Sequence, residues 1–395
     1  MIAIGLEVVE PLGRVIARPW ADAVTGVQID SRRIRDGDLF VAVGGGSDFV
    51  EHALARGASA ALVPRDAHAA LAELATVVRS RSKARIVGIT GSTGKTSTKD
   101  ILFALCAPHA ATIANEGNYN NELGVPLTLC RLEPETEICI SEMGMRGLGQ
   151  IAQLAETARP DIGVITNVGP VHLELVETIE NVARAKAELI AALPAGGIAV
   201  VPDEPLLEPY LTRSDIVVER VHPDLEIPFT TSYRSRHQLA NTRTAIVTAR
   251  CLGVPLPTGT LNVEFSKLRE EEHPLPGGGL LLNDCYNANP VSMRAALTHL
   301  VERAGAGRRL AVLGEMAELG ETAPLYHREV GELVRELGVS VIAVGELGRF
   351  YGGEWVATAA DAAVRLRDEL RPGDVVLVKG SRSVGLEVVA ENLLN

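Results

Sequence analysis

Residues 90–98 read Thr-Gly-Ser-Thr-Gly-Lys-Thr-Ser-Thr and directly follow the apolar run Ile86–Ile89. Glycines at 91 and 94 let the backbone turn tightly and aim its N–H groups at one point, and a following helix adds the positive end of its dipole. A lysine and a hydroxyl in this order can reach the β- and γ-phosphates and Mg²⁺. The pattern predicts a triphosphate-binding loop made of Gly91, Ser92, Thr93, Gly94, Lys95, Thr96 and Ser97.

This loop departs from the strict G-x-x-x-x-G-K-[ST] spacing, because Ile89 stands where the first glycine belongs. The alternative interpretation is a glycine-rich turn that only begins a helix. The succession of strand, glycines, lysine and hydroxyl favours the phosphate role.

Two other residues are candidates for holding the metal that accompanies a triphosphate. Glu142 comes soon after the apolar residues 138–140, and His172 ends a loop that follows residues 162–165. Mg²⁺ takes oxygen ligands and shares them with substrate phosphates, and ligands gather at the carboxyl ends of parallel strands. The upstream loop favours a ligand role for Glu142. His172 taken in isolation is more typical of a packed or exposed histidine.

Amide side chains are concentrated in two segments. Asn118 and Asn121 lie in residues 112–126, and Asn287 and Asn289 lie in residues 283–290 at the end of an expected strand. An amide both donates and accepts hydrogen bonds, as recognition of adenine or of a peptide requires. An asparagine-rich turn without a ligand is the alternative.

These residues must be positioned by alternating strands and helices. Apolar runs predict strands at residues 85–90, 137–141, 162–166 and 197–201, and again at 280–283, 309–313, 339–344 and 374–378, with helices between them. The alternation indicates an α/β protein with mostly parallel, doubly wound sheets. A polar linker at residues 79–83 and a Pro/Gly-rich break at 253–259 divide it into three expected domains, 1–80, 81–255 and 256–395.

Composition excludes several classes of protein. The chain has 46% hydrophobic and 22% charged residues, which is typical of a globular protein rather than a disordered one. Its net charge of −12 gives no general attraction to nucleic acid. Five separated cysteines, no signal-like beginning and no apolar stretch of membrane-spanning length predict a cytoplasmic protein without membrane insertion.

With these motifs assembled, the chain closely resembles the Mur ligases, ATP-dependent amide-bond-forming enzymes of peptidoglycan precursor synthesis. The loop at 90–96 looks like their ATP loop, and residues 118–126, 141–144, 166–172 and 185–188 follow in the family's order. Residues 284–293 and 313–320 resemble the member that joins D-alanyl-D-alanine to UDP-N-acetylmuramoyl-tripeptide. The resemblance implies a small N-terminal UDP-substrate domain, a central P-loop-type ATPase domain and a C-terminal Rossmann-like domain. It also implies these two small-molecule substrates, and we expect a monomer.

The resemblance also implies catalytic roles. Lys95 and its loop would hold the ATP phosphates, Thr96 and Glu142 would bind one Mg²⁺, and His172 would bind a second. Lys186 matches a lysine that is carbamylated in much of the family, where the resulting carboxylate helps to hold the second metal. An unmodified surface lysine is the expectation from the sequence alone.

Further roles follow from the same resemblance. Arg269 would reach the γ-phosphate, Asp284 would lie near the ribose, and Asn241 would help bind adenine from the helix face that it shares with His237. Asp30, Ser31 and Arg32 resemble the segment that contacts UDP. The residues expected to face the incoming dipeptide are Asn287, Asn289, Lys379, Ser381 and Arg382.

Two departures from the family pattern affect substrate preference. Residues 47–52 replace the usual Asp-Gly-His of the first domain, and the stretch 202–237 is shorter than usual. A related amide ligase with another amino acid or polymer substrate is therefore one alternative. A P-loop kinase or regulatory ATPase is another, and a catalytically silent nucleotide-binding protein is a third.

Overall fold

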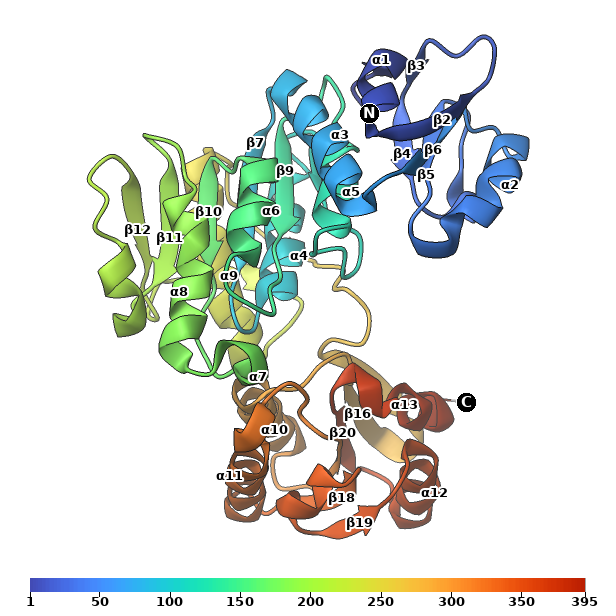
Figure 1. Cartoon of the computed structure of the whole chain (residues 1–395). Helices are drawn as coiled ribbons and strands as arrows, with labels where there is room; N and C mark the ends of the chain where they lie inside the picture. The colour runs from blue at the N-terminus through green and yellow to red at the C-terminus, as the bar shows by residue number, and fades with distance from the viewer. Residues whose placement is uncertain (395) are drawn as a thin grey trace.

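Three sheets, one after another along the chain, organise the structure, a computed structural model that describes residues 1–394. Each sheet belongs to its own α/β unit, and in Figure 1 the first unit lies to the right of the central one and the last unit lies below it. The predicted α/β class and three-domain layout are confirmed. No helix within residues 1–394 has the length and apolar character needed to cross a bilayer.

The first unit is a four-stranded sheet in the order β2-β6-β5-β4. Strand β2 is antiparallel to β6, and the other pairs are parallel. Its strands are β2 (Gly13–Ala17), β4 (Gly26–Gln28), β5 (Asp38–Val41) and β6 (Ala60–Pro64), beside a small ribbon of β1 (Ile4–Gly5) and β3 (Ala23–Val24). Helices α1 (Leu6–Val9) and α2 (Val50–Ala55) complete it.

Helix α3 (Ala67–Arg81) connects the first unit to the second. It packs against α5 (Gly124–Leu129) and α6 (Gln150–Ala158) of the central unit, burying Leu71, Leu74 and Val78. The prediction of a linker at 79–83 is wrong for residues 79–81, which form the last helical turn. Arg79 is held there because its guanidinium donates to the carbonyl oxygen of Ala158 at 3.0 Å, and cations near a helix C-terminus are stabilising.

The central unit contains six parallel strands in the order β12-β11-β10-β7-β9-β8. They are β7 (Arg85–Thr90), β8 (Thr112–Ala114), β9 (Ile138–Glu142), β10 (Ile162–Ile165), β11 (Ile198–Pro202) and β12 (Val217–Val221). The four strands predicted here are confirmed to within one residue at each end.

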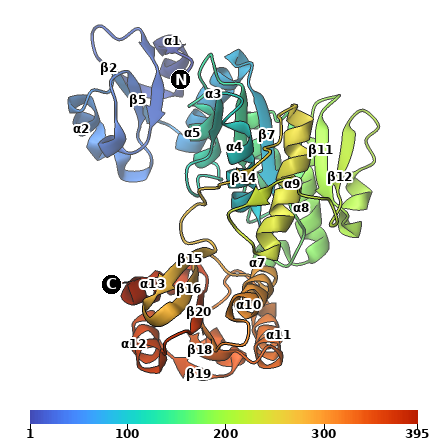
Figure 2. The ribbon, with the colours of Figure 1, turned by 180° about the vertical axis from the view of Figure 1, so that it is seen from behind.

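Helices cover both faces of this sheet (Figure 2). Alternating strand residues divide between them, so that Val87 packs with α4 (Lys95–Cys106) and α9 (Arg236–Leu252), whereas Ile86 packs with α3, α6 and α8 (Ile179–Ala191). This two-residue period is what a strand buried on both faces requires. A short pair, β13 (Thr230–Thr231) and β14 (Thr260–Leu261), and the helix α7 (Leu173–Val176) lie in its connections.

The C-terminal unit has six strands in the order β15-β16-β20-β17-β18-β19, with only β15 antiparallel. They are β15 (Glu271–Leu275), β16 (Gly279–Asp284), β17 (Arg309–Leu313), β18 (Ser340–Val344), β19 (Glu354–Val356) and β20 (Val375–Lys379). Helices α10 (Pro290–Ala304) and α11 (Ala323–Glu336) cover one face, and α12 (Ala359–Glu369) and α13 (Glu387–Leu394) cover the other. All four predicted strands are present to within one residue at each end.

Candidate functional site

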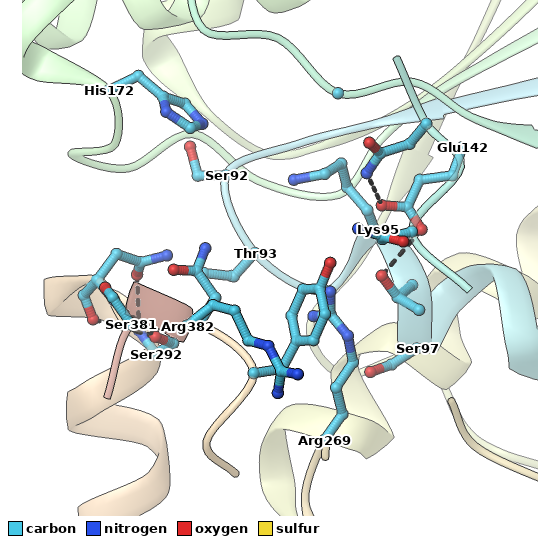
Figure 3. A pocket seen from close by; sticks show the side chains of 18 of the residues that line it. Ser92, Thr93, Lys95, Ser97, Glu142, His172, Arg269, Ser292, Ser381 and Arg382 are labelled. Carbon is cyan, nitrogen blue, oxygen red and sulfur yellow. Dashed lines mark hydrogen bonds between the residues drawn. The ribbon is translucent and has the colours of Figure 1, made fainter. Parts of the chain in front are cut away.

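A cleft of about 1030 Å³ lies between the central and C-terminal units. The loop that follows β7 forms one wall, residues that follow β16, β17 and β20 form the opposite wall, and Asp66 and His68 reach it from the start of α3. Figure 3 shows side chains from both units turned into this space. The carboxyl ends of parallel strands thus meet at one site, as is usual for ligand sites in open α/β sheets.

The predicted phosphate loop lies on the central wall, with residues 92–97 lining the cleft. Both of its glycines are required by close packing. A Cβ on Gly91 would lie 1.9 Å from Oγ1 of Thr166, and one on Gly94 would lie 2.3 Å from Oδ1 of Asn241, and both residues have positive φ. Helix α4 begins directly after Gly94, so its amino end points at the cleft.

Asn167 fixes the shape of this loop from the end of β10. Its Oδ1 accepts hydrogen bonds from the backbone N–H of Ser92 at 3.1 Å and of Thr93 at 2.9 Å. The Ser92 hydroxyl also donates to the carbonyl oxygen of Gly169 at 2.9 Å. Asn167 is a functional residue that the sequence did not single out, although its place directly after a predicted strand was the available signal.

Thr96 and Glu142 meet as the sequence predicted. The Thr96 hydroxyl donates to Oε2 of Glu142 at 2.8 Å, and the amide of Asn120 donates to Oε1 at 2.7 Å. Hydroxyl and carboxylate oxygens beside a phosphate loop are the donor set that Mg²⁺ prefers. Residues 1–394 hold no cluster of three or more His, Cys, Asp or Glu that could cage a metal. The arrangement fits Mg²⁺ shared with a phosphate.

Lys95 and Arg269 place positive charge beside the loop. The Lys95 ammonium donates to the carbonyl oxygen of Gly91 at 2.7 Å. Burial lowers the pKa of Lys95; the Glu142 carboxylate opposes that shift, and Arg269 adds to it. The Arg269 guanidinium lies 4.1 Å from the ring centre of Tyr286. This cation–π contact holds the guanidinium in the cleft.

His172 lies beside Ser92 at the other end of the loop (Figure 3). Its Nδ1 is 2.5 Å from Oε2 of Glu318, which comes from the C-terminal unit, and Nε of Arg146 is 3.3 Å from the other carboxylate oxygen. The neighbouring His172 holds the pKa of Glu318 below its ordinary value, and Arg146 acts in the same direction. Glu318 lies within residues 313–320, a segment that resembles the family. The sequence predicts no role for it, because only folding brings it to His172.

Lys186 is buried, with a relative exposure of 1%, on the face of α8 that packs against the central sheet. The expectation of a surface lysine is therefore wrong. Burial lowers the pKa of Lys186 well below its ordinary value, and the charge of Lys95 contributes to the shift. Lys186 is close enough to Lys95 to feel its charge, but it is not among the residues that line the cleft.

The residues expected to hold adenosine are separated. Asn241 is buried against Gly94, and its amide nitrogen has no hydrogen-bond partner among the described residues, which leaves a donor for a ligand. Asp284 lines the cleft, but its Oδ2 is 2.5 Å from Nζ of Lys379, whose side chain is 1% exposed. Asp284 and Lys379 therefore form a buried ion pair that joins the ends of β16 and β20.

Most of the predicted amide and hydroxyl residues line the cleft and also support its walls. Asn121 accepts from the backbone N–H of Gly124 at 3.0 Å at the start of α5, and Asn289 forms a capping box at the start of α10. The Ser381 hydroxyl accepts from the backbone N–H of Ala317 at 2.9 Å. Asn118 and Arg382 also line the cleft, but within residues 1–394 their side chains make no hydrogen bond that supports a wall. The Arg382 guanidinium lies 3.4 Å from the Glu387 carboxylate.

Asp30, Ser31 and Arg32 lie on the first unit, outside the lining of this cleft. The Asp30 carboxylate accepts from the Arg32 guanidinium at 2.8 Å, and the Ser31 hydroxyl is 3.0 Å from Nδ1 of His52. The structure therefore joins this segment to the altered residues 47–52, a contact that the sequence did not indicate.

Comparison with known proteins agrees with this geometry. The family model of the Mur ligase middle domain matches residues 89–215, and that of the Mur ligase, glutamate ligase domain matches residues 272–382. The UDP-N-acetylmuramoyl-tripeptide--D-alanyl-D-alanine ligase of Synechocystis sp. is 34% identical, over 94% of this chain and 92% of that protein. The chain belongs to the Mur ligase family.

Solved Mur ligases share its architecture. MurF from Acinetobacter baumannii superposes with a TM-score of 0.85 at 25% identity, covering 98% of this chain and 97% of that one. MurF ligase from Thermotoga maritima, solved in complex with ADP, gives 0.80 at 28% identity over 93% and 96% of the two chains. The resemblance predicted from the motifs and the assignment to ATP-dependent ligases are both confirmed.

Proposed function

We propose that this Mur ligase joins D-alanyl-D-alanine to the peptide carboxylate of UDP-N-acetylmuramoyl-tripeptide at the expense of ATP. The observation that carries the proposal is a match to ligases of this name along nearly the whole chain. The cleft supports it, because the phosphate loop faces a second wall of polar groups that can receive another substrate.

The chemistry follows from the charges on the central wall. A carboxylate at neutral pH is a poor electrophile, so transfer of the γ-phosphoryl group to it first gives an acyl phosphate. Lys95 and Arg269 offset the negative charge that gathers on the phosphoryl oxygens, mainly through position and electrostatics. The amine then attacks the acyl carbon, and phosphate leaves.

The metal residues fall into two groups. Thr96 and Glu142 would hold one Mg²⁺ and His172 a second, and these ions supply charge neutralisation on the phosphates. Carbamylation of Lys186 is proposed as the source of a further carboxylate. Support comes from its burial and lowered pKa, because the neutral amine is the form that reacts with CO₂.

The roles of the substrate-contact residues are likewise proposals that follow from the resemblance to the family. The buried amide nitrogen of Asn241, which has no partner within residues 1–394, would bind the nucleotide base, and Asp284 on the opposite wall would lie near the ribose. Asp30, Ser31 and Arg32 would bind UDP on the first unit, at the far end from the phosphate loop. The polar residues that would face the dipeptide are Asn287, Asn289, Lys379, Ser381 and Arg382. Asn118 and Asn121 would bind substrate from the central unit.

We also propose three domains at 1–80, 81–255 and 256–395, and a cytoplasmic monomer. The free cysteines at 106, 130, 139, 251 and 285 support a reducing compartment. Because acyl phosphates hydrolyse, the C-terminal unit should close over the central one before chemistry.

Product identification tests the function. Purified protein is given UDP-N-acetylmuramoyl-tripeptide, Mg·ATP and an equimolar mixture of D-alanyl-D-alanine and single amino acids, and the products are identified by mass. The dipeptide adduct with matching release of ADP and phosphate is expected. An adduct with another amine would instead identify a different Mur-type ligase, and ATP turnover that is independent of any amine would identify a kinase or ATPase.

A further inference from the structure

None of the residues proposed to face the dipeptide carries a negative charge that could bind the ammonium group of the amine substrate. An α-amino group has a pKa of about 7.7–8.0, so much of it arrives as an ammonium ion. A carboxylate near the reacting atoms is the natural partner for that charge. The carboxylates that line the cleft are Asp66, Glu122, Glu142, Glu270, Asp284 and Glu318.

Three of these carboxylates already have strong partners. Glu142 accepts from Thr96 and Asn120 at the expected metal position. Asp284 is paired with the buried ammonium of Lys379. Glu270 accepts from the Ser235 hydroxyl at 2.7 Å, at the end of the cleft where α9 begins.

Two others lie away from the wall that faces the phosphate loop. Asp66 belongs to the first unit, where its carboxylate accepts from the backbone N–H of His68 at 2.9 Å and so caps α3. Glu122 is exposed on the asparagine-rich loop of the central unit itself. Glu318 differs from these acids because it comes from the C-terminal wall and its partners, His172 and Arg146, belong to the central unit across the cleft.

The loop that carries Glu318 is built to hold it in place. Glu318 has a φ of 62°, which is unusual for a residue with a side chain and persists only where the surroundings impose it. The backbone N–H of Met316 donates to Nε2 of His327 at 3.0 Å, that of Ala317 donates to Ser381, and the Tyr351 hydroxyl donates to the carbonyl oxygen of Gly314 at 2.9 Å. A strained residue on a pinned loop keeps a fixed direction.

That direction is toward the central unit, at the His172 end of the phosphate loop. The Glu318 carboxylate contacts His172 of the central unit, and His172 lies beside Ser92 of the phosphate loop (Figure 3). The Glu318 side chain nevertheless remains 37% exposed, so a small cation can approach it. An ammonium bound there would lie at the edge of the phosphate loop, within the cleft that both substrates share under the proposed function.

We propose that Glu318 binds the ammonium group of the incoming amine substrate and sets it beside the activated carboxyl, where the ammonium loses a proton to solvent before the free amine attacks. The inference rests on the proposed function and adds a substrate contact on the C-terminal wall. In the free protein His172 and Arg146 occupy the carboxylate. The amine substrate takes over part of this contact when it binds.

The test compares a charged amine with a neutral one. Glu318→Gln keeps the shape of the side chain and removes its charge. The wild-type protein and the variant are assayed with D-alanyl-D-alanine and, separately, with hydroxylamine, a neutral nucleophile that converts an acyl phosphate into a hydroxamate. Glu321→Gln, which removes a charge from an exposed acid of the same loop region, is the matched control.

For Glu318→Gln we expect the KM for D-alanyl-D-alanine to rise about tenfold or more. Hydroxamate formation and the KM values for Mg·ATP and the UDP-linked substrate should stay within about twofold of wild type, and Glu321→Gln should resemble wild type. Glu318→Asp, which retains the charge, should recover part of the loss.

Two results would overturn the inference. An equal loss with both nucleophiles would make Glu318 a support for His172 or for the contact between units, and an unchanged KM for the dipeptide would remove it from the amine site. The proposed function fails separately, if the wild-type protein forms hydroxamate but no dipeptide adduct. In that case the same pair of assays is run with the amine that the wild-type protein accepts.

Discussion

Asn120 donates a 2.7 Å hydrogen bond from its side-chain amide to Oε1 of Glu142, the carboxylate whose other oxygen accepts from Thr96. Its own backbone oxygen accepts from the N–H of Gly144 at 2.7 Å, so the asparagine is tied to the end of β9 at two points. The two hydrogen bonds, one to each oxygen, hold the plane of the Glu142 carboxylate. Asn120 therefore determines how this oxygen pair faces the phosphate loop.

Replacing Asn120 by alanine should weaken metal binding rather than substrate binding. Loss of a supporting hydrogen bond to a metal ligand typically costs about 10- to 100-fold in metal affinity or activity. We expect the Mg²⁺ concentration for half-maximal activity to rise by about that factor, while the KM for the UDP-linked substrate changes little. A rise confined to the latter KM would make Asn120 a substrate contact instead.

Lys95→Ala should abolish phosphate release while leaving binding of the UDP-linked substrate nearly intact. The lysine lies on the phosphate loop, and the segment proposed to hold UDP is on the first unit. The two quantities can be measured on one preparation, phosphate release by a coupled assay and binding by calorimetry. Equal loss of both would contradict the separation of the two sites.

The buried pair of Asp284 and Lys379 makes a stability prediction. Asp284→Ala leaves the Lys379 ammonium, which is 1% exposed, without its partner, and breaking such pairs costs about 3–5 kcal/mol. We expect lower resistance of the C-terminal unit to urea, followed by fluorescence of Trp355 in a Trp20→Phe background. The double variant Asp284→Ala with Lys379→Met should recover part of the loss.

If Asp284 instead serves mainly to contact ribose, Asp284→Ala would raise the KM for ATP with little change in the urea midpoint. Measuring both quantities on the same variant separates the two roles.

His327 predicts how stability depends on pH. Burial lowers the pKa of His327 below its ordinary value, and its two nitrogens contact the N–H of Met316 and the carbonyl oxygen of Ala323. Below the ordinary pKa of about 6.5 the unfolded chain binds a proton that the folded chain does not, so this contribution to stability is lost as the pH falls.

Thermal unfolding of wild type and His327→Gln at pH 7.5 and 5.5 checks the sign. The unfolding midpoint of the wild type should fall by more than that of the variant when the pH is lowered. At pH 7.5 the variant should already have the lower midpoint, because its hydrogen bonds to the loop are weaker. A wild type whose midpoint falls no more than that of the variant would argue against a buried neutral histidine.

Much of the fold could be read from local pattern. Strands β7, β9, β10 and β11 appeared as short apolar runs, because a strand buried on both faces needs apolar residues at successive positions. The phosphate loop was predictable for a similar reason, since its glycines, lysine and hydroxyl act within one turn of chain. Residues 79–81 show what local pattern cannot predict. Their charges indicated a linker, but they end helix α3, where Arg79 donates to the carbonyl oxygen of Ala158 at the end of α6.

The sequence by itself determined four of the six strands in each of the two larger sheets, the phosphate loop and the family, because each depends on residues that are neighbours along the chain. Only the tertiary structure decided that Glu318 reaches His172, that Asn167 shapes a loop 74 residues away, and that Lys186 is buried. Those contacts depend on the order of strands in the sheets and on how the units meet. Residue types alone cannot specify such long-range packing, since many partners of the same chemistry were available to each group.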